Sequence, residues 1–241
     1  MTADEWEASD DALEMLKAVR GKWRDQAALQ QALQRYYLAC CRAVWPLLPH
    51  PRTRRGVEAA ERYLDGLASA EDLDRADRDA QWAAHDVESG VYPDIDAARA
   101  QAAEALSSGR LRLAPPVDDG SGAPRRHPLN EAAWFAAHAV GYRHDKYMKV
   151  RERWYARFHS ARLLRCVFAN PFRRPTMLPA WRTGDVVGLA RGIDEDRAYD
   201  RMPLLGDALM DAGADEQLLV HARADGHVRG CWLVDLVLSK E

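Results

Sequence analysis

The sequence predicts an all-α fold, a multi-helix array of about nine or ten helices with the C-terminal helix buried. Two observations predict this fold class. Apolar residues recur at three- and four-residue intervals along most of the chain, whereas no useful window alternates polar with apolar residues as a half-buried strand does. Capping residues, glycines and prolines separate these amphipathic segments, as expected for helices joined by turns.

The first predicted helices lie between residues 2 and 45. Thr2 and Glu5 have the spacing of a capping box and begin a short helix. The acidic pair at residues 10–11 caps a second helix, which ends at Gly21. Residues 25–45 carry an apolar stripe at helical spacing, so they predict a longer helix that the following prolines end.

Three more helices are predicted before the middle of the chain. Residues 52–67 are amphipathic, and residues 94–106 also have a helical pattern. Between them, Ser69 and Asp72 predict the cap of a helix that presents alanines on one face.

Residues 107–128 hold three glycines and four prolines and little that is apolar. This composition predicts a loop or linker, which we expect to be the most mobile internal segment and the first site of limited proteolysis. It separates an N-terminal helical part, residues 1–106, from a C-terminal helical part, residues 129–241. The two parts either fold separately or pack as one domain.

The C-terminal part begins with a segment that predicts one long helix over residues 129–168, with Gly141 as its only expected break. Thr183 then predicts the cap of another helix. Asp215 is the predicted cap of a short helix that extends to about Ala222.

Residues 227–238 are the most apolar stretch of the chain and predict a docked terminal helix. Trp232 and Leu236 lie four residues apart, so we expect them to be buried together on one face. Asp235 lies inside this apolar run, and an unpaired buried carboxylate is costly. We therefore expect an arginine, Arg197 or Arg201, to pair with it.

The composition excludes several classes of protein. A net charge of −3 over 241 residues does not indicate a nucleic-acid-binding surface overall. Four cysteines without a CxxC pair do not form a disulfide framework, so a reducing cytoplasm is the expected compartment. No run of roughly 18 apolar residues predicts a membrane span, and the acidic start predicts no signal peptide.

Several motifs of the chain resemble those of one family of all-helical bacterial proteins. The N-terminal motifs are Met1-Thr-x-x-Glu-Trp6, Ala39-Cys-Cys-Arg42 and Val57-Glu-x-Ala-Glu-Arg-Tyr-x-Asp-Gly-Leu67. The C-terminal motifs are Asn170-Pro-Phe-Arg173, Asp200-Arg-Met-Pro-Leu-Leu205 and His227-Val-Arg-Gly-Cys-Trp-x-Val-Asp-Leu236. The resemblance covers about residues 1–75 and 165–241 and implies no activity. It also implies that related chains carry cysteines at the positions of Ala214 and Ala222.

A metal site is one candidate function of the C-terminal part. His221, His227 and Cys231 follow the spacing H-x5-H-x3-C, and imidazole and thiolate groups are ligands that zinc prefers. A closed site needs a fourth ligand, for which the nearby acids Asp215, Asp225 and Asp235 are the candidates. The alternative is that Cys231 is a small core residue and the two histidines are ordinary polar residues. The sequence assigns no cofactor.

A basic strip is a second candidate. Within residues 142–165 the positions i, i+3, i+7 and i+11 of the predicted long helix are Lys146, Lys149, Arg153 and Arg157. Basic residues beside aromatic ones can bind nucleic acid or another anion. The alternative is that these residues flank a packed core and pair with acids.

No catalytic motif is present, although an enzyme of unknown class remains an alternative. The sequence instead favours a helical protein–protein interaction or scaffold module with a protein partner. Arg173 and Trp181 lie in rigid proline-containing turns, and residue types of this kind are common at binding hot spots. Nucleic acid stays a possible partner, and a membrane is not expected.

Overall fold

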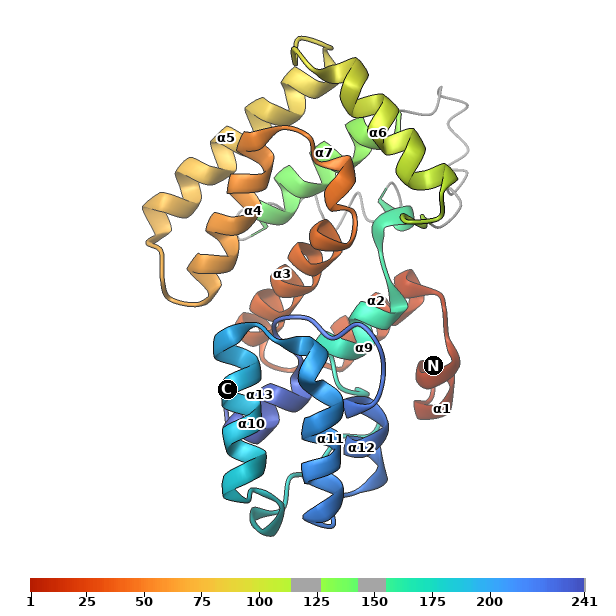
Figure 1. Cartoon of the computed structure of the whole chain (residues 1–241), viewed down its shortest axis with the longest axis vertical. Helices are drawn as coiled ribbons and strands as arrows, with labels where there is room; N and C mark the ends of the chain where they lie inside the picture. Colours follow the sequence, from red (N-terminus) through yellow and green to blue (C-terminus); the bar gives the residue numbers. More distant parts are fainter. Residues whose placement is uncertain (114–126, 143–154, 241) are drawn as a thin grey trace. The chain divides into compact units, whose positions relative to one another are not determined.

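A computed structural model describes residues 1–113, 127–142 and 155–240 of the chain (Figure 1). These described residues are 70% helical and contain no strand, which confirms the predicted all-α class. They contain 12 α-helices rather than nine or ten. Contacts divide the chain into two compact units. Unit 1 comprises residues 1–32 and 160–241, and unit 2 comprises residues 33–159.

The predicted linker at residues 107–128 falls inside unit 2 rather than between the two units. Most of it, residues 114–126, lies outside the described residues, so its expected mobility stays a prediction. The division found in the structure instead joins the two ends of the chain in one unit. Helix α3, Gln26–Ala43, begins in unit 1 and continues into unit 2.

Unit 1 is built from short helices that begin at the predicted caps. Its α-helices are α1 (Ala3–Ala8), α2 (Ala12–Lys22), α9 (Ala161–Val167), α10 (Gly184–Asp196), α11 (Met202–Asp211), α12 (Glu216–Ala222) and α13 (Trp232–Leu238). Single 3-10 turns occur at η3 (Pro179–Trp181) and η4 (Tyr199–Arg201). Thr2 and Glu5 form the expected capping box, and Thr183 caps α10 through the amide of Val186.

Helix α13 is docked, but through a different face from the one predicted. Leu233, Val234 and Val237 are buried in the core of unit 1 with side chains of α10, α11 and α12. Trp232 and Leu236 are only partly buried against that core, so the expectation that they form the buried face was wrong. Helix α13 packs on α10 and α12, and this packing turns the side chains of Val234 and Val237, three residues apart, toward the core.

The carboxylate of Asp235 lies 3.8 Å from the ammonium group of Lys240. Arg201, one of the two arginines expected to pair with it, is instead 3.2 Å from Asp196.

Helix α1 is held against α9 and the segment that follows it. The guanidinium group of Arg165 donates hydrogen bonds to the carbonyl oxygens of Trp6 and Ser9. The side-chain amide of Asn170 donates to the carbonyl oxygen of Ala3 at 3.0 Å and to the carboxylate of Glu7 at 2.8 Å. Because Asn170 is buried, these hydrogen bonds fix the N-terminal helix in unit 1.

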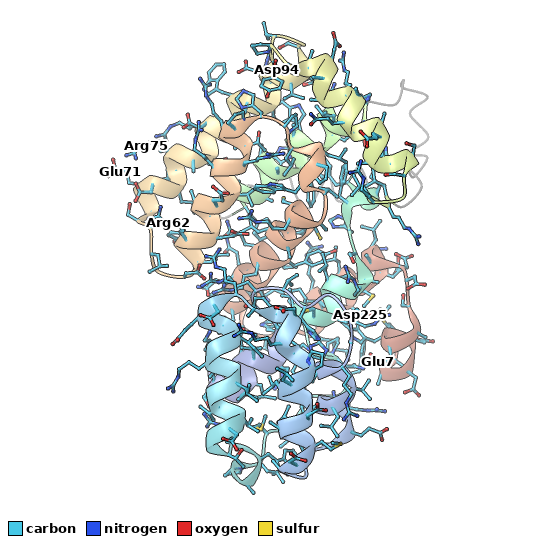
Figure 2. All side chains as sticks on the ribbon, in the orientation of Figure 1. Glu7, Arg62, Glu71, Arg75, Asp94 and Asp225 are labelled. Carbon is cyan, nitrogen blue, oxygen red and sulfur yellow. The ribbon has the colours of Figure 1, made fainter. Side chains whose placement is uncertain are left out.

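Unit 2 packs α4 (Pro51–Leu64), α5 (Ala70–Glu88) and α7 (Pro128–Val140) together, with α6 (Ile95–Ser107) and the greater part of α3. Gly56 permits a close approach of helices, because a Cβ atom there would lie 3.1 Å from the Cβ of Ala80 and 3.3 Å from Val140. The solvent side of α5 carries charges such as Arg75, which lies 3.6 Å from Glu71 (Figure 2). Such exposed ion pairs contribute little to stability.

The long helix predicted over residues 129–168 is interrupted. Helix α7 ends at Val140, residues 156–158 form a 3-10 turn, and Ser160 caps the separate helix α9. The break follows Gly141, where a Cβ atom would collide with the carboxylate of Asp77. Residues 143–154 lie outside the described part of the chain.

Two histidines cap helices of unit 2 and predict a pH dependence of its stability. The Nδ1 atoms of His50 and His127 accept hydrogen bonds from the amides of Arg52 and Leu129, at 3.1 and 3.2 Å. Burial lowers the pKa of both imidazoles, because it disfavours the charged form. The folded state therefore binds protons less readily than the unfolded state, in which histidine has its ordinary pKa of about 6.5.

The stabilisation by these caps is complete above the unfolded-state pKa and is lost as the pH falls toward the folded-state values. We expect the free energy of unfolding, measured in urea, to drop by about 1 kcal/mol per cap between about pH 7.5 and pH 5. Asparagine also caps helices but does not titrate in this range, so the double variant His50→Asn, His127→Asn should lose most of this dependence. An unchanged pH profile in that variant would refute the assignment.

Candidate metal centre

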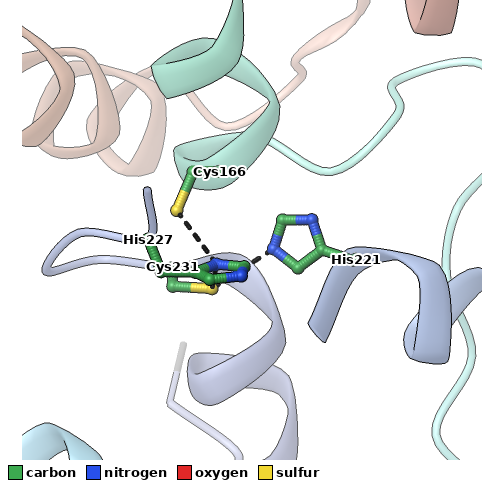
Figure 3. Close-up of side chains that lie close together, drawn as sticks. All are labelled: Cys166, His221, His227 and Cys231. Atoms are coloured by element: carbon green, nitrogen blue, oxygen red, sulfur yellow. Dashed lines mark hydrogen bonds between the residues drawn. The ribbon is translucent and has the colours of Figure 1, made fainter. Parts of the chain in front are cut away.

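Four side chains of unit 1 converge on one point, and all belong to residue types that bind zinc. They are Cys166, His221, His227 and Cys231 (Figure 3). One ligand atom from each lies within 4.8 Å of the other three. Three of these residues are the metal ligands predicted from the sequence, and Cys166 is the fourth that the sequence did not reveal. Among the described residues, no other group of histidines, cysteines and acids converges in this way.

Cys166 reaches the site from the last turn of α9, which Ser160 caps through the amide of Leu163. The thiol is 3% exposed and belongs to the core of unit 1. Arg165, the preceding residue, is fixed by its hydrogen bonds to the carbonyl oxygens of α1. Its own carbonyl oxygen accepts a hydrogen bond from the indole of Trp232 at 3.1 Å. The end of α9 is therefore held on two sides.

His221 lies in the last turn of α12, the helix that Asp215 caps through the amide of Gln217. The chain then makes a turn that places His227 and Cys231 beside it. Gly226 and Gly230 both have positive φ angles, 76° and 82°, a conformation that side chains other than glycine rarely adopt. At Gly226 a Cβ would also collide with the guanidinium group of Arg162. Both glycines are therefore required by the path of the turn.

The separations between nitrogen and sulfur fit a tetrahedral metal site. The Nδ1 atom of His227 lies 3.7 Å from the sulfur of Cys166 and 3.6 Å from that of Cys231. The Nε2 atom of His221 lies 3.3 Å from the sulfur of Cys231. Zinc bonds of about 2.3 Å to sulfur and 2.0–2.1 Å to nitrogen, at tetrahedral angles, place the two atom types about 3.6 Å apart.

Hydrogen bonds among the four side chains explain their arrangement less well than a bound metal ion does. A neutral imidazole has one N–H, so the single Nδ1 atom of His227 cannot donate fully to both sulfurs. The backbone amide of Val228 points at the sulfur of Cys166 from 3.4 Å. Such an N–H group stabilises a thiolate, which is the form that binds metal, and orients it from outside the coordination sphere.

The pKa values of the two thiols shift in opposite directions. A hydrogen bond from Cys231 is the main cause that lowers the pKa of Cys166, and the amide of Val228 acts in the same direction. Burial, followed by the same interaction with Cys166, raises the pKa of Cys231 to about 12. A divalent cation between the sulfurs would take the place of the proton in this hydrogen bond, because metal binding releases protons from thiol ligands.

Packing rather than further hydrogen bonds orients the two imidazoles. The ring of His221 lies 4.4 Å from that of Trp232 and 4.9 Å from that of His227, measured between centroids. The second ring nitrogen of His227 is buried without a hydrogen-bond partner among the described residues. The aromatic side chain of Trp232 is therefore part of the support of the site, which explains its partial burial.

A pocket of about 840 Å³ lies beside the four residues. Cys166, His221 and His227 line it, whereas Cys231 does not. Charges of both signs surround it, including Arg162 and Asp225. One side of the candidate site is therefore open to a space large enough for small molecules, while Cys231 is 1% exposed and lies in the core.

The other residues singled out in the sequence have different roles. Lys146, Lys149 and Arg153 lie outside the described residues. Arg157 is largely buried and pairs with Glu131 at 3.2 Å, which does not fit the expectation of an exposed basic strip at this position.

Arg173 is exposed and lines the pocket, 3.6 Å from Asp4. Trp181 is partly buried and packs on the core of unit 1, so its role in the described structure is packing.

None of the three acids considered as a fourth ligand belongs to the site. Asp215 caps α12, Asp225 is exposed at the pocket, and Asp235 lies near Lys240. Cys166 takes this place although it is 55 residues before His221 in the sequence. The sequence offered one signal for Cys166. The adjacent pair Cys40 and Cys41 is buried in unit 2, so Cys166 is the one cysteine besides Cys231 outside that pair.

No family model, curated protein or solved structure matches this chain. In the described part of the chain, every helix is too short or too polar to cross a membrane.

Proposed function

We propose that the protein binds one zinc ion through Cys166, His221, His227 and Cys231, and that this ion is a structural centre of a helical protein–protein interaction or scaffold module. One observation carries the zinc proposal. Four zinc-type donors from separate places in the sequence lie within 4.8 Å of one another, with nitrogen–sulfur separations of 3.3, 3.6 and 3.7 Å. Zinc fits a set of two thiolates and two imidazoles.

The charges of the ligands support a zinc-bound site, rather than a metal-free group of hydrogen-bonded side chains, as the functional state of the protein. Both cysteines are buried, and a buried thiolate is costly when nothing compensates its charge. A Zn²⁺ ion neutralises two thiolates, and neutral imidazoles add no charge. The bound site as a whole therefore carries no net charge, which suits its position at the edge of an apolar core.

The ligand count supports a structural role. Four protein ligands complete a tetrahedral sphere, whereas catalytic zinc sites keep one position for water or substrate. The ion would join the end of α12 and the start of α13, which follow each other in the chain, to the end of α9, which lies more than 50 residues earlier. A centre of this kind fixes a surface rather than performs chemistry, which supports the interaction role.

Metal analysis of the purified chain tests the zinc centre. We expect one zinc per chain in the wild type, and its loss in the variants Cys166→Ala and Cys231→Ala. Cys41→Ala is the matched control, because Cys41 is also a buried cysteine but lies in unit 2. Wild-type protein without zinc after purification and zinc addition would refute the proposal, as would equal zinc content in all four proteins.

The interaction role needs its own test. A partner that binds the zinc-loaded wild type and the Cys41→Ala variant, but not the double variant Cys166→Ala, Cys231→Ala, would support it. The double variant must first show the helical circular dichroism of the wild type. A chain that binds zinc but turns over a substrate in the adjacent pocket would replace the interaction role with an enzymatic one.

A further inference from the structure

We propose that Cys166 and Cys231 form a redox couple: a hydroperoxide oxidises them to a disulfide, and the site then releases its zinc. Disulfide formation depends only on the two thiols and the pocket, whereas zinc release rests on the proposed function. The experiment below separates these two parts. The proposal assigns a modification site to Cys166 and a resolving role to Cys231.

The geometry brings the two sulfurs together without a metal. They belong to one group of atoms that all lie within 4.8 Å, so an approach of at most about 3 Å makes a bond of the usual 2.0 Å length. The adjacent residues Cys40 and Cys41, by contrast, lie on successive positions of α3, where neighbouring side chains point in different directions. They supply an internal control within the same chain.

Access distinguishes the two sulfurs of the site. Cys166 lines the pocket of about 840 Å³, which is far larger than a hydroperoxide needs. Cys231 does not line it, although both cysteines are buried residues. The oxidant therefore meets the sulfur of Cys166 first. Arg162 lies one helical turn before Cys166 and lines the same pocket. Its positive charge favours the anionic thiolate of Cys166, which is the form that attacks the oxidant.

The chemistry is that of an ordinary thiol couple. The thiolate of Cys166 attacks one peroxide oxygen, the O–O bond breaks, and Cys166 becomes a sulfenic acid while an alkoxide leaves and takes up a proton. The sulfur of Cys231 then attacks the sulfur of Cys166, and hydroxide leaves as water after a second protonation. In total, two thiolates, one hydroperoxide and two protons give one disulfide, one alcohol and one water.

Zinc release follows from the loss of ligands. The disulfide sulfurs are no longer thiolates, so only His221 and His227 remain to bind the ion. Two imidazoles hold zinc much more weakly than the complete set of four ligands. The new bond still joins α9 to the start of α13, whereas α12 loses its link to both. Oxidation therefore replaces the metal cross-link of unit 1 with a disulfide and leaves α12 held by its packing on α11 and α13.

The experiment treats the zinc-loaded full chain with hydrogen peroxide in the presence of a chromogenic zinc chelator. Peptide mapping by mass spectrometry then identifies the oxidised cysteines. We expect one zinc released per Cys166–Cys231 disulfide, and recovery of zinc binding after reduction with dithiothreitol. The control Cys41→Ala should behave as the wild type, while Cys166→Ala and Cys231→Ala should form no disulfide in unit 1.

The same treatment of metal-free wild-type protein separates the two proposals. A Cys166–Cys231 disulfide in a chain that never binds zinc would sustain the redox couple and remove the zinc centre. A chain that keeps its zinc under peroxide, or in which Cys166 proceeds to sulfinic acid while Cys231 stays reduced, would overturn the redox proposal and leave the zinc centre intact. A disulfide between Cys40 and Cys41 instead would overturn it as well.

Discussion

Zinc removal is expected to destabilise unit 1 by about 4 kcal/mol, relative to protein in free zinc at about 1,000 times the dissociation constant. The reason is that the ion binds a site that exists only when α9, α12 and α13 are folded together. Hydrogen exchange measured by mass spectrometry follows the two units separately. Amides of α13 should lose protection after chelation, and amides of α5 in unit 2 should keep it.

The control for this prediction is the double variant Cys166→Ala, Cys231→Ala, in which added zinc should change the protection of neither helix. Equal protection of α13 with and without zinc in the wild type would contradict a structural role. Equal loss of protection in α5 would show that chelation acts on the whole chain rather than on unit 1.

Leu233→Ala is expected to reduce the free energy of unfolding by about 2–5 kcal/mol, because it removes a fully buried side chain and leaves a cavity. Leu236→Ala on the same helix is the matched control. Leu236 is only partly buried, so its truncation should cost clearly less. Denaturant titration with circular dichroism measures both. An effect of Leu236→Ala equal to or greater than that of Leu233→Ala would mean that α13 buries its other face.

Local signals in the sequence predicted most helix starts. The pairs Thr2–Glu5 and Ser69–Asp72 both form capping boxes, because each depends only on residues three apart. Asp215 caps α12 for the same reason. Interactions of short range are encoded in the spacing of the residues that make them, so they can be read without knowledge of the fold.

The break expected at Gly141 in the predicted helix over residues 129–168 is confirmed, whereas the separate start of α9 after Ser160 was not predicted, because periodicity does not show where a helix stops. Apolar residues continue at helical intervals beyond Gly141, but they belong to more than one element. The buried face of α13 failed for a similar reason. Trp232 and Leu236 share one side of the helix, yet the neighbours α10 and α12 contact the side that holds Leu233 and Val237. Tertiary packing decides which face is buried.

Three of the four residues of the candidate site were predicted from the sequence. His221, His227 and Cys231 lie within eleven residues and could be grouped by spacing. Cys166 could not, because only the packing of α9 against the turn before α13 brings its sulfur to the other three. The three nearby acids are wrong as the fourth ligand, because the side chain that completes the group is a second thiol from a distant part of the sequence.

X-ray absorption at the zinc edge of the zinc-loaded chain tests the proposed four-ligand zinc centre. We expect two sulfur ligands at about 2.3 Å and two nitrogen ligands at about 2.0–2.1 Å. Cys166→Ala should lose one sulfur from this shell, or lose the metal, while Cys41→Ala should leave the spectrum unchanged. A zinc shell made of oxygen and nitrogen without two sulfurs, or a chain that binds no zinc, would refute this centre.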